Sequence, residues 1–177
     1  MLRFIYHQPM SVLIFVFGIL IVAWAVLNSN LNGFNKLLNV TIVFATVLVI
    51  VYSTLLKRTV SNFQLELRPF YTFVMAQEQV EYYRTFFMNA LLFVPLGLSM
   101  PYVLSKKPRK WTVFVTIIFA ALLSAGIEFL QYYYRLGRCE TDDVIANTLG
   151  AAVGTLSYLL YKKILNNQEK GSLMQKI

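Results

Sequence analysis

The sequence contains few of the residues that form disulfides or hold metals. Cys139 is the only cysteine, which excludes an internal disulfide, and His7 is the only histidine and lies far from the other polar residues of interest. We therefore expect no metal site and no cofactor. There is no G-x-S-x-G motif, and no Cys–His pair can form around the polar residues described below, so neither common nucleophile arrangement is indicated.

Charged residues are also scarce. Only 14% of the residues are charged and 58% are hydrophobic, far from the composition of an ordinary soluble domain, so lipid is the expected solvent. The net charge is +8, but no basic block alternates with aromatic residues along a polar helix face, which argues against a nucleic-acid partner. The positive charges flank apolar runs, where they typically orient a membrane protein and contact lipid headgroups.

Five apolar runs are each about 17 residues or longer, enough to span most of a bilayer core as a helix. They cover residues 10–27, 40–56, 86–104, 111–134 and 144–161. A membrane accepts only helices or closed barrels, and these runs lack the alternation of barrel strands. The expected fold is all-α: a polytopic membrane helical bundle that forms one domain over residues 1–177, with a flexible polar tail at 166–177.

The distribution of Lys and Arg predicts the orientation of this bundle. With five spans, one side carries nine Lys or Arg, including those of residues 106–110 and of the tail, and the other carries seven. Four of those seven lie beside acidic residues or in motifs, so the bias places the N-terminus outside and the C-terminus in the cytoplasm of a multi-pass cell-membrane protein. Arg3 and the Ala23-Trp24-Ala25 triplet also resemble a cleaved signal peptide, which would place the C-terminus on the opposite side of the membrane. We prefer five spans.

The segment from Lys57 to Thr85 is long for a connection in a helical bundle. Hydrophobic residues first alternate up to Leu67, and the stretch from Tyr71 to Tyr83 is rich in aromatic residues, which favour the headgroup level. This pattern predicts an interfacial or partly re-entrant outer loop, with a plain solvated loop as the alternative. Within the third run, Pro95 should bend or break the helix.

The polar residues of the last two runs organise the chain. Ser124, Glu128, Gln131 and Arg135 share one helical face, and Asp143, Asn147, Gly150, Gly154 and Ser157 share another after a short charged loop. Ionisable groups at membrane depth are costly and usually face a protein interior or a water-filled cavity. Arg68 and Asn89 should reach the same level, so the sequence predicts a polar site in the outer leaflet.

Simpler roles exist for several of these residues. Thr141 can cap the last helix, with Asp142 and Asp143 favouring its positive end. Asn147 can hydrogen-bond a neighbouring helix, and Gly150 and Gly154 form a small-xxx-small pair typical of close helix packing. A structural ion pair between Glu128 and Arg138 is a further alternative.

Four blocks carry a resemblance to a known family. The segments ELRPF, NALLFVPLGLSMP, EFLQ and GRCETDDVIANTLGAAVG, within residues 65–160, resemble the signature blocks of the VanZ-like family. The matching positions are Arg68, Pro69, Phe70, Asn89, Pro95, Gly97, Glu128, Gln131, Arg138, Asp143, Asn147 and Gly150. The resemblance implies an integral membrane helical bundle associated with low-level resistance to the glycopeptide teicoplanin. The chain departs from the pattern at Glu66, where Asn is expected in many relatives, and at Cys139, where an apolar residue is typical.

Two functions follow from these residues. In the first, Arg68 and Arg138 hold a phosphate or carboxylate, and the other ligand-binding candidates, Asn89, Glu128, Gln131, Asp143 and Asn147, complete the site. A lipid-linked cell-wall precursor or the glycopeptide itself would fit an amphipathic cleft among membrane lipids.

In the alternative, the protein is an intramembrane enzyme. Glu128 with Asp142 or Asp143 would divide acid and base roles on a lipid-linked precursor, and Arg138 would stabilise developing charge. A transporter ranks third, because no repeat is detectable. The ligand, turnover and the oligomeric state stay open at this stage.

Overall fold

The computed structural model describes residues 10–30, 35–56, 58, 64–77, 81–104 and 109–174. The chain divides into two units, Met1–Asn35 and Lys36–Ile177. The first unit contains helix α2 (Met10–Asn30), which covers the first expected run. Near its end, Asn28 Nδ2 donates a hydrogen bond at 2.9 Å to the Trp24 carbonyl, one turn earlier in the helix.

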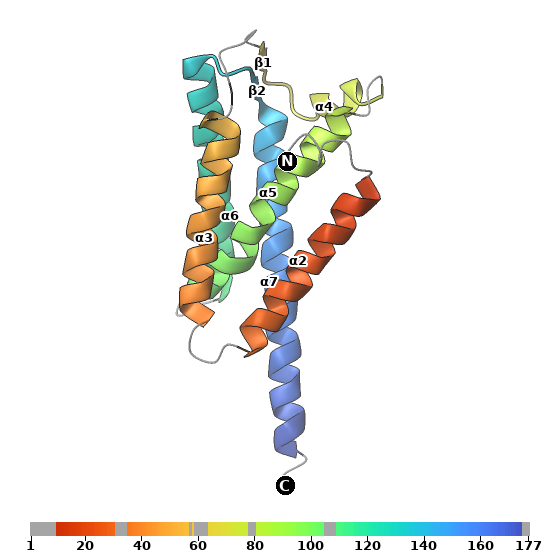
Figure 1. Ribbon diagram of the computed structural model, residues 1–177, viewed down its shortest axis with the longest axis vertical. Coiled ribbons are helices and arrows are strands. Elements are labelled where there is room, and N and C mark those ends of the chain that lie inside the picture. Colours follow the sequence, from red (N-terminus) through yellow and green to blue (C-terminus); the bar gives the residue numbers. More distant parts are fainter. Residues whose placement is uncertain are drawn as a thin grey trace. The chain divides into compact units, whose positions relative to one another are not determined.

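Long helices dominate the second unit (Figure 1). The helices are α3 (Asn35–Val51), continued by the π-helical turn η1 (Tyr52–Leu56), then α4 (Tyr71–Met75), α5 (Glu81–Val103), α6 (Arg109–Tyr134) and α7 (Thr141–Met174). Among the described residues, four helices are long and apolar enough to cross a membrane: Asn35–Leu56, Glu81–Val103, Arg109–Tyr134 and Thr141–Gln168. An all-α membrane bundle is confirmed, but the count is about four rather than the expected five.

The helices of the second unit are apolar both inside and outside. Ile50, Phe93, Leu96, Ala120, Ile127 and Ala151, from α3, α5, α6 and α7, form the buried core. Large apolar side chains also cover the outward faces, including Phe44 and Leu48 on α3, Phe114 and Leu122 on α6, and Leu156 and Leu160 on α7. An exposed apolar surface of this extent is rare on soluble monomers and is expected where lipid replaces water. The outward faces of these helices are therefore suited to lipid contact.

Helices α5 and α7 pack backbone to backbone. A Cβ atom built on Gly150 would overlap the Ala90 carbonyl, and one on Gly154 would overlap the Val94 carbonyl. From the other side, a Cβ on Gly97 would overlap the Ala151 carbonyl. The hypothesis that Gly150 and Gly154 mediate close helix packing is confirmed, because only glycine lets the two backbones approach this closely.

Helix α5 continues through both of its prolines. Sequence reasoning allowed a break at Pro95, but α5 is helical from Glu81 to Val103 with Pro95 and Pro101 inside it, so a break at Pro95 is wrong. Pro101 cannot donate to the carbonyl of Gly97, four residues earlier. Thr155 Oγ1 on α7 lies 3.3 Å from that carbonyl oxygen and 2.9 Å from the Ala151 carbonyl oxygen of its own helix, so its one proton is shared between the two. A neighbouring helix thus replaces a hydrogen bond that proline removes, as is common in membrane helices.

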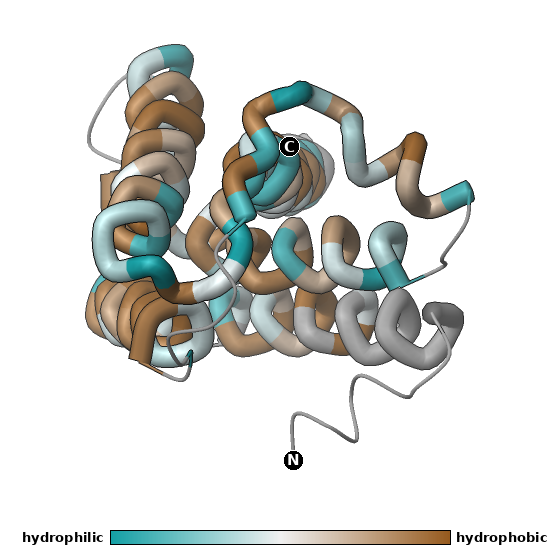
Figure 2. The backbone as a smooth tube through the Cα atoms, turned by 90° about the horizontal axis from the view of Figure 1, so that it is seen from above, coloured by the Kyte–Doolittle hydropathy of each residue, from teal (hydrophilic) through white to brown (hydrophobic). Residues whose placement is uncertain are grey.

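A small parallel sheet lies at one end of the helices, together with α4 (Figure 1). Strands β1 (Gln64–Glu66) and β2 (Arg138–Glu140) pair with Gln64 opposite Arg138 and Glu66 opposite Glu140. Sequence reasoning noted alternation near Leu65 but predicted no strand. Viewed from this end in Figure 2, hydrophilic residues recur along the strand and loop segments above largely hydrophobic helices.

The rest of the outer loop is only partly described. Residues 59–63 and 78–80 lie outside the described residues, as do residues 175–177 of the expected tail. In the described part, Phe70 and Val74 are exposed, and Phe73 packs its ring edge against Tyr83 and Phe86 at centroid distances of 5.7 and 5.1 Å. This arrangement agrees with an interfacial loop, which stays a prediction.

Candidate functional site

A hollow of about 450 Å³, called here the polar cavity, lies at the sheet end of the second unit. It is lined by Gln64, Leu65, Glu66, Tyr71, Met75, Tyr82, Arg138 and Glu140. Its volume falls within the range of roughly 300–1,000 Å³ that is usual for ligand pockets. Charged groups of both signs and two phenol rings meet there, so the polar cavity is the natural centre of a candidate site.

The end of α6 directs the chain into the polar cavity. After Tyr134, Arg135 takes a left-handed conformation (φ 53°), with Arg135 N–H bonded to the Tyr132 carbonyl and Leu136 N–H to the Gln131 carbonyl. These two bonds form a Schellman motif, which ends the helix. Arg135 is therefore exposed, and the expectation that it shares the inward face with Gln131 is wrong, because the helix ends one residue earlier.

Arg138 and Glu140 form the charged wall of the polar cavity. They lie two residues apart on β2, on the same face of the strand, and Arg138 Nε contacts Glu140 Oε1 at 2.6 Å. The guanidinium also lies over the Tyr82 ring, 5.0 Å from its centroid. Burial raises the pKa of Glu140 above its ordinary value, although the neighbouring Arg138 acts in the opposite direction. The pair thus contains a carboxylate whose charge is only partly compensated.

Glu128 stabilises the backbone of β2 in this wall. Its Oε2 accepts a hydrogen bond from the Glu140 backbone N–H at 2.9 Å, and the residue is 7% exposed. Since Arg138 pairs with Glu140, the alternative of a Glu128–Arg138 ion pair is wrong. Cys139 beside it is buried, and burial, with the Glu128 carboxyl as a second cause, raises the pKa of the thiol to about 11.

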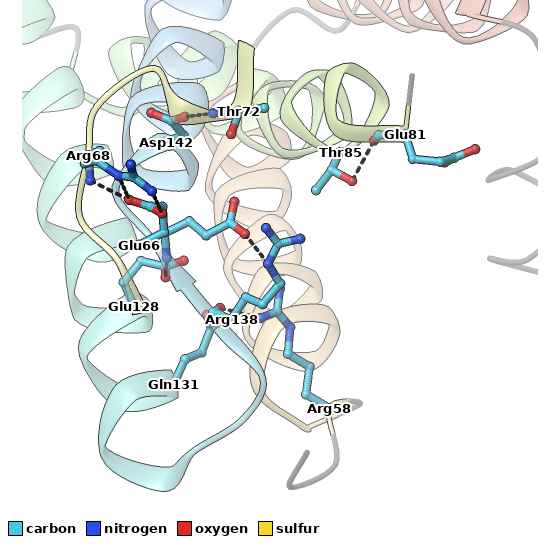
Figure 3. Close-up of polar contacts among 11 residues, drawn as sticks. Arg58, Glu66, Arg68, Thr72, Glu81, Thr85, Glu128, Gln131, Arg138 and Asp142 are labelled. Carbon is cyan, nitrogen blue, oxygen red and sulfur yellow. Dashed lines mark hydrogen bonds and ion pairs between the residues drawn. The ribbon is translucent and has the colours of Figure 1, made fainter. Parts of the chain in front are cut away.

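Gln131 is bound to a residue that sequence reasoning missed as a site candidate. Arg58 Nη1 donates to Gln131 Oε1 at 3.1 Å and to the Arg138 carbonyl at 3.2 Å (Figure 3). Gln131 Nε2 in turn donates to the Thr54 carbonyl at 3.1 Å. Arg58 is one of the seven Lys and Arg residues counted on the outer side, and its place just after η1 is the signal that could have identified it. Gln131 therefore joins α6 to the end of η1.

Asp142 fixes the loop that closes the polar cavity. Its Oδ1 accepts from the Phe70 backbone N–H at 2.5 Å. Its Oδ2 accepts from the Thr72 N–H at 2.7 Å (Figure 3). These are N–H groups at the start of α4, which has no cap from its own side chains. Asp142 lies in the first turn of α7, where its charge was expected to favour the positive end of that helix, and its carboxylate also caps α4. It also holds Phe70 in a left-handed conformation (φ 63°).

Arg68 makes its main ion pair within its own loop. Its Nε and Nη2 contact the two carboxylate oxygens of Glu66, each at 2.8 Å, and its guanidinium stacks on the Tyr71 ring at 4.0 Å (Figure 3). The hydrogen bonds from Arg68 lower the pKa of Glu66 to about 2, and this partner raises the pKa of Arg68. Glu66 and Glu140 face each other across the ladder, where like charges repel, and each has its own arginine.

The remaining candidates lie among the helices. Asn89 on α5 lies beside the Asp143 carboxyl on α7. Asn147 Nδ2 donates to Ser124 Oγ at 2.8 Å, which confirms the expected bond to a neighbouring helix. Asn147 Oδ1 is buried without a hydrogen-bond partner among the described residues. These residues line no part of the polar cavity, and their contacts connect α5, α6 and α7.

The site thus has two layers. Arg138, Glu140 and Glu66 reach the polar cavity, while Glu128, Gln131 and Asp142 hold its walls through backbone hydrogen bonds and Arg58. Among the described residues, no group of three or more His, Cys, Asp or Glu is arranged to hold a metal ion. The arrangement can offer a guanidinium and a partly compensated carboxylate to one small ligand.

Comparison with known proteins agrees with the family resemblance. The VanZ/LLP1 family profile matches residues 11–162. Protein VanZ of Enterococcus faecium is 25% identical over 138 residues, which cover 78% of this chain and 79% of that protein. No solved structure matches the chain. The family and the four apolar helices support a multi-pass membrane protein, and the matched range spans most of the chain: the protein belongs to the VanZ/LLP1 family.

Proposed function

We propose that the protein contributes to glycopeptide resistance of the teicoplanin type by binding an amphipathic or lipid-linked envelope ligand in the polar cavity. The observation that carries the proposal is the position of Arg138 in the cavity wall, 41% exposed at its side chain and fixed by Glu140 and Tyr82. An oriented guanidinium is a strong partner for phosphate or carboxylate. The apolar helix faces of the same unit suit the lipid portion of such a ligand.

The contacts of the carboxylates favour binding over catalysis. Glu128, Asp142 and Asp143, the candidates for acid and base roles, are absent from the cavity lining. Glu128 and Asp142 each accept backbone N–H groups, which are structural bonds. An enzyme needs such a group within hydrogen-bond reach of the substrate. Binding therefore remains the first proposal.

The proposal places the sheet end of the unit at the outer leaflet. Because α3 ends at this end, its start would lie on the cytoplasmic side, and the side of the N-terminus then depends on whether α2 also crosses. Two single-cysteine proteins in a Cys139→Ala background test this: Gln77→Cys at the sheet end and Lys163→Cys near the other end of α7, both at exposed positions. A membrane-impermeant maleimide should label Gln77→Cys in intact cells and spare Lys163→Cys. The reverse labelling would contradict the orientation.

The function is tested with two arginines of the same loop. Arg138→Gln removes the charge from the polar cavity, and Arg135→Gln removes an equal charge from an exposed position outside its lining. At matched membrane abundance, we expect Arg138→Gln to lose teicoplanin protection and Arg135→Gln to retain it. Native mass spectrometry of the purified proteins should show a co-purified envelope ligand that is depleted only in Arg138→Gln. Equal protection by the two variants would refute a site at Arg138.

A further inference from the structure

The charges that line the polar cavity are not equally compensated. Glu66 is saturated, because both of its carboxylate oxygens contact Arg68, and the pKa of this carboxyl falls to about 2. A ligand would have to break that bidentate pair to use Glu66. The charges available to a ligand are therefore those of Arg138 and Glu140.

One carboxylate oxygen of Glu140, Oε2, is available to bind a cation. Its Oε1 contacts Arg138 Nε, and no side chain of the described residues donates a hydrogen bond to its Oε2. Its side chain is only 11% exposed, so its charge is poorly solvated. Burial raises the pKa of this carboxyl in spite of Arg138, which is the behaviour of a carboxylate short of positive charge. A hydrogen-bonding cation in the cavity would relieve this deficit.

The terminal nitrogens of the Arg138 guanidinium are available to bind an anion. Its Nε makes the contact with Glu140, and within the described part of the chain the two terminal nitrogens of the guanidinium donate no hydrogen bond, so they are available. Glu140 on one side and the Tyr82 ring on another fix the plane of the group. A guanidinium held in this way presents its terminal N–H groups in a preset geometry, which lowers the entropic cost of binding an oxyanion.

We propose that the polar cavity recognises a zwitterionic headgroup, whose phosphate or carboxylate binds the terminal nitrogens of Arg138 while its primary ammonium binds Glu140. This inference rests on the proposed function and specifies the chemistry of its ligand. The ion pair between Arg138 and Glu140 is kept, and the ligand adds a second positive and a second negative charge beside it. Neither an anion alone nor a cation alone would leave the cavity neutral.

The test uses the purified full-length protein and small soluble probes in a calorimetric titration. Phosphoethanolamine carries both charges, ethyl phosphate only the anion, and phosphocholine has a cation without N–H donors. We expect phosphoethanolamine to bind about tenfold more tightly than either of the others, the size of one charge-assisted hydrogen bond. The pair of β-alanine and propionate repeats the comparison with a carboxylate, and so separates a phosphate ligand from a carboxylate ligand.

Two variants test which residue binds the ammonium and which binds the anion of the probe. Glu140→Gln should lose the preference for phosphoethanolamine over ethyl phosphate, and its thermal unfolding reports that it is folded. Arg138→Gln should lose all the probes, whereas Arg135→Gln should keep them. The comparison of phosphoethanolamine with phosphocholine on the unmodified protein needs no variant at all, so a misfolded Glu140→Gln would leave the test intact.

The failures of the two proposals are distinguishable. Equal affinity for phosphoethanolamine and ethyl phosphate would overturn the zwitterion inference, while an Arg138-dependent anion site and the proposed function would stand. A preference that survives in a folded Glu140→Gln would also overturn the inference. Binding of none of the probes would overturn it as well, and teicoplanin protection that persists in Arg138→Gln would then remove the proposed function too.

Discussion

The close packing of α5 on α7 predicts different stabilities for two glycine-to-alanine substitutions. A Cβ on Gly150 would overlap the backbone carbonyl of Ala90, whereas one on Gly126 of α6 meets nothing within 4 Å. Both positions are helical, so both substitutions gain about 1 kcal/mol of helix propensity. At Gly150 the two helices must also move apart, because a backbone carbonyl cannot rotate away, and overpacking of this kind costs about 1–3 kcal/mol.

The measurable quantity is the gap between the two variants. Since the propensity gain is common to both, Gly150→Ala should be less stable than Gly126→Ala by about 1–3 kcal/mol. At about 2–4 °C per kcal/mol for a chain of this size, the Tm values should differ by about 2–12 °C. Thermal unfolding in one detergent, followed by the monodisperse fraction on size exclusion, measures this difference. Equal Tm values would show that α5 and α7 do not meet backbone to backbone at Gly150.

Three further predictions concern the sheet end. Asp142→Asn leaves one oxygen to accept the two N–H groups at the start of α4, so limited proteolysis should cut the loop around Phe70 faster than in a control with Glu81→Gln, and equal cleavage would contradict the cap. Cys139 is buried with a pKa near 11, so a maleimide should label it only after denaturation; rapid labelling of the folded protein in detergent would contradict its burial. Because the pKa of Glu140 is raised in the folded state, its contribution to stability is fully present below its ordinary pKa and is lost as pH rises through the raised value. Denaturation between pH 4 and 8 should therefore show a stability difference between the unmodified protein and Glu140→Gln that falls as pH rises, and a difference independent of pH would argue against the raised pKa.

Cys139 lies in the short charged loop that the sequence predicts between the last two runs, and the structure shows that it is buried there. Residue Cys139 is the central residue of β2, and its side chain points away from the face shared by Arg138 and Glu140. That direction is inward, which explains both its burial and its contact with Glu128. The strand assignment alone would have predicted this, but three residues between two long helices give no periodic signal strong enough to identify a strand.

The sequence by itself determined the membrane class, the helices and the glycine face of α7. These depend on local properties: hydropathy sets what can span a bilayer, and the i, i+4 spacing sets which residues share a helical face. It also indicated the polar residues that gather at the sheet end, since alternating helices bring the ends of successive runs together. The expected count of five spans included the first run, whose apolar sequence resembles that of the others. The four candidate spans among the described residues do not include it.

Only the tertiary structure decided which polar groups bind each other. The pairing of β1 with β2 joins residues more than 70 positions apart, and it sets Glu66 opposite Glu140. Because side chains two residues apart on a strand face the same side, Arg138 pairs with Glu140 on β2. The Glu128 carboxylate accepts a backbone N–H of the strand instead. A carboxylate can satisfy a backbone donor, an arginine or a helix end equally well by its chemistry. Distance in the folded chain selects among these partners, and a linear sequence does not contain that distance.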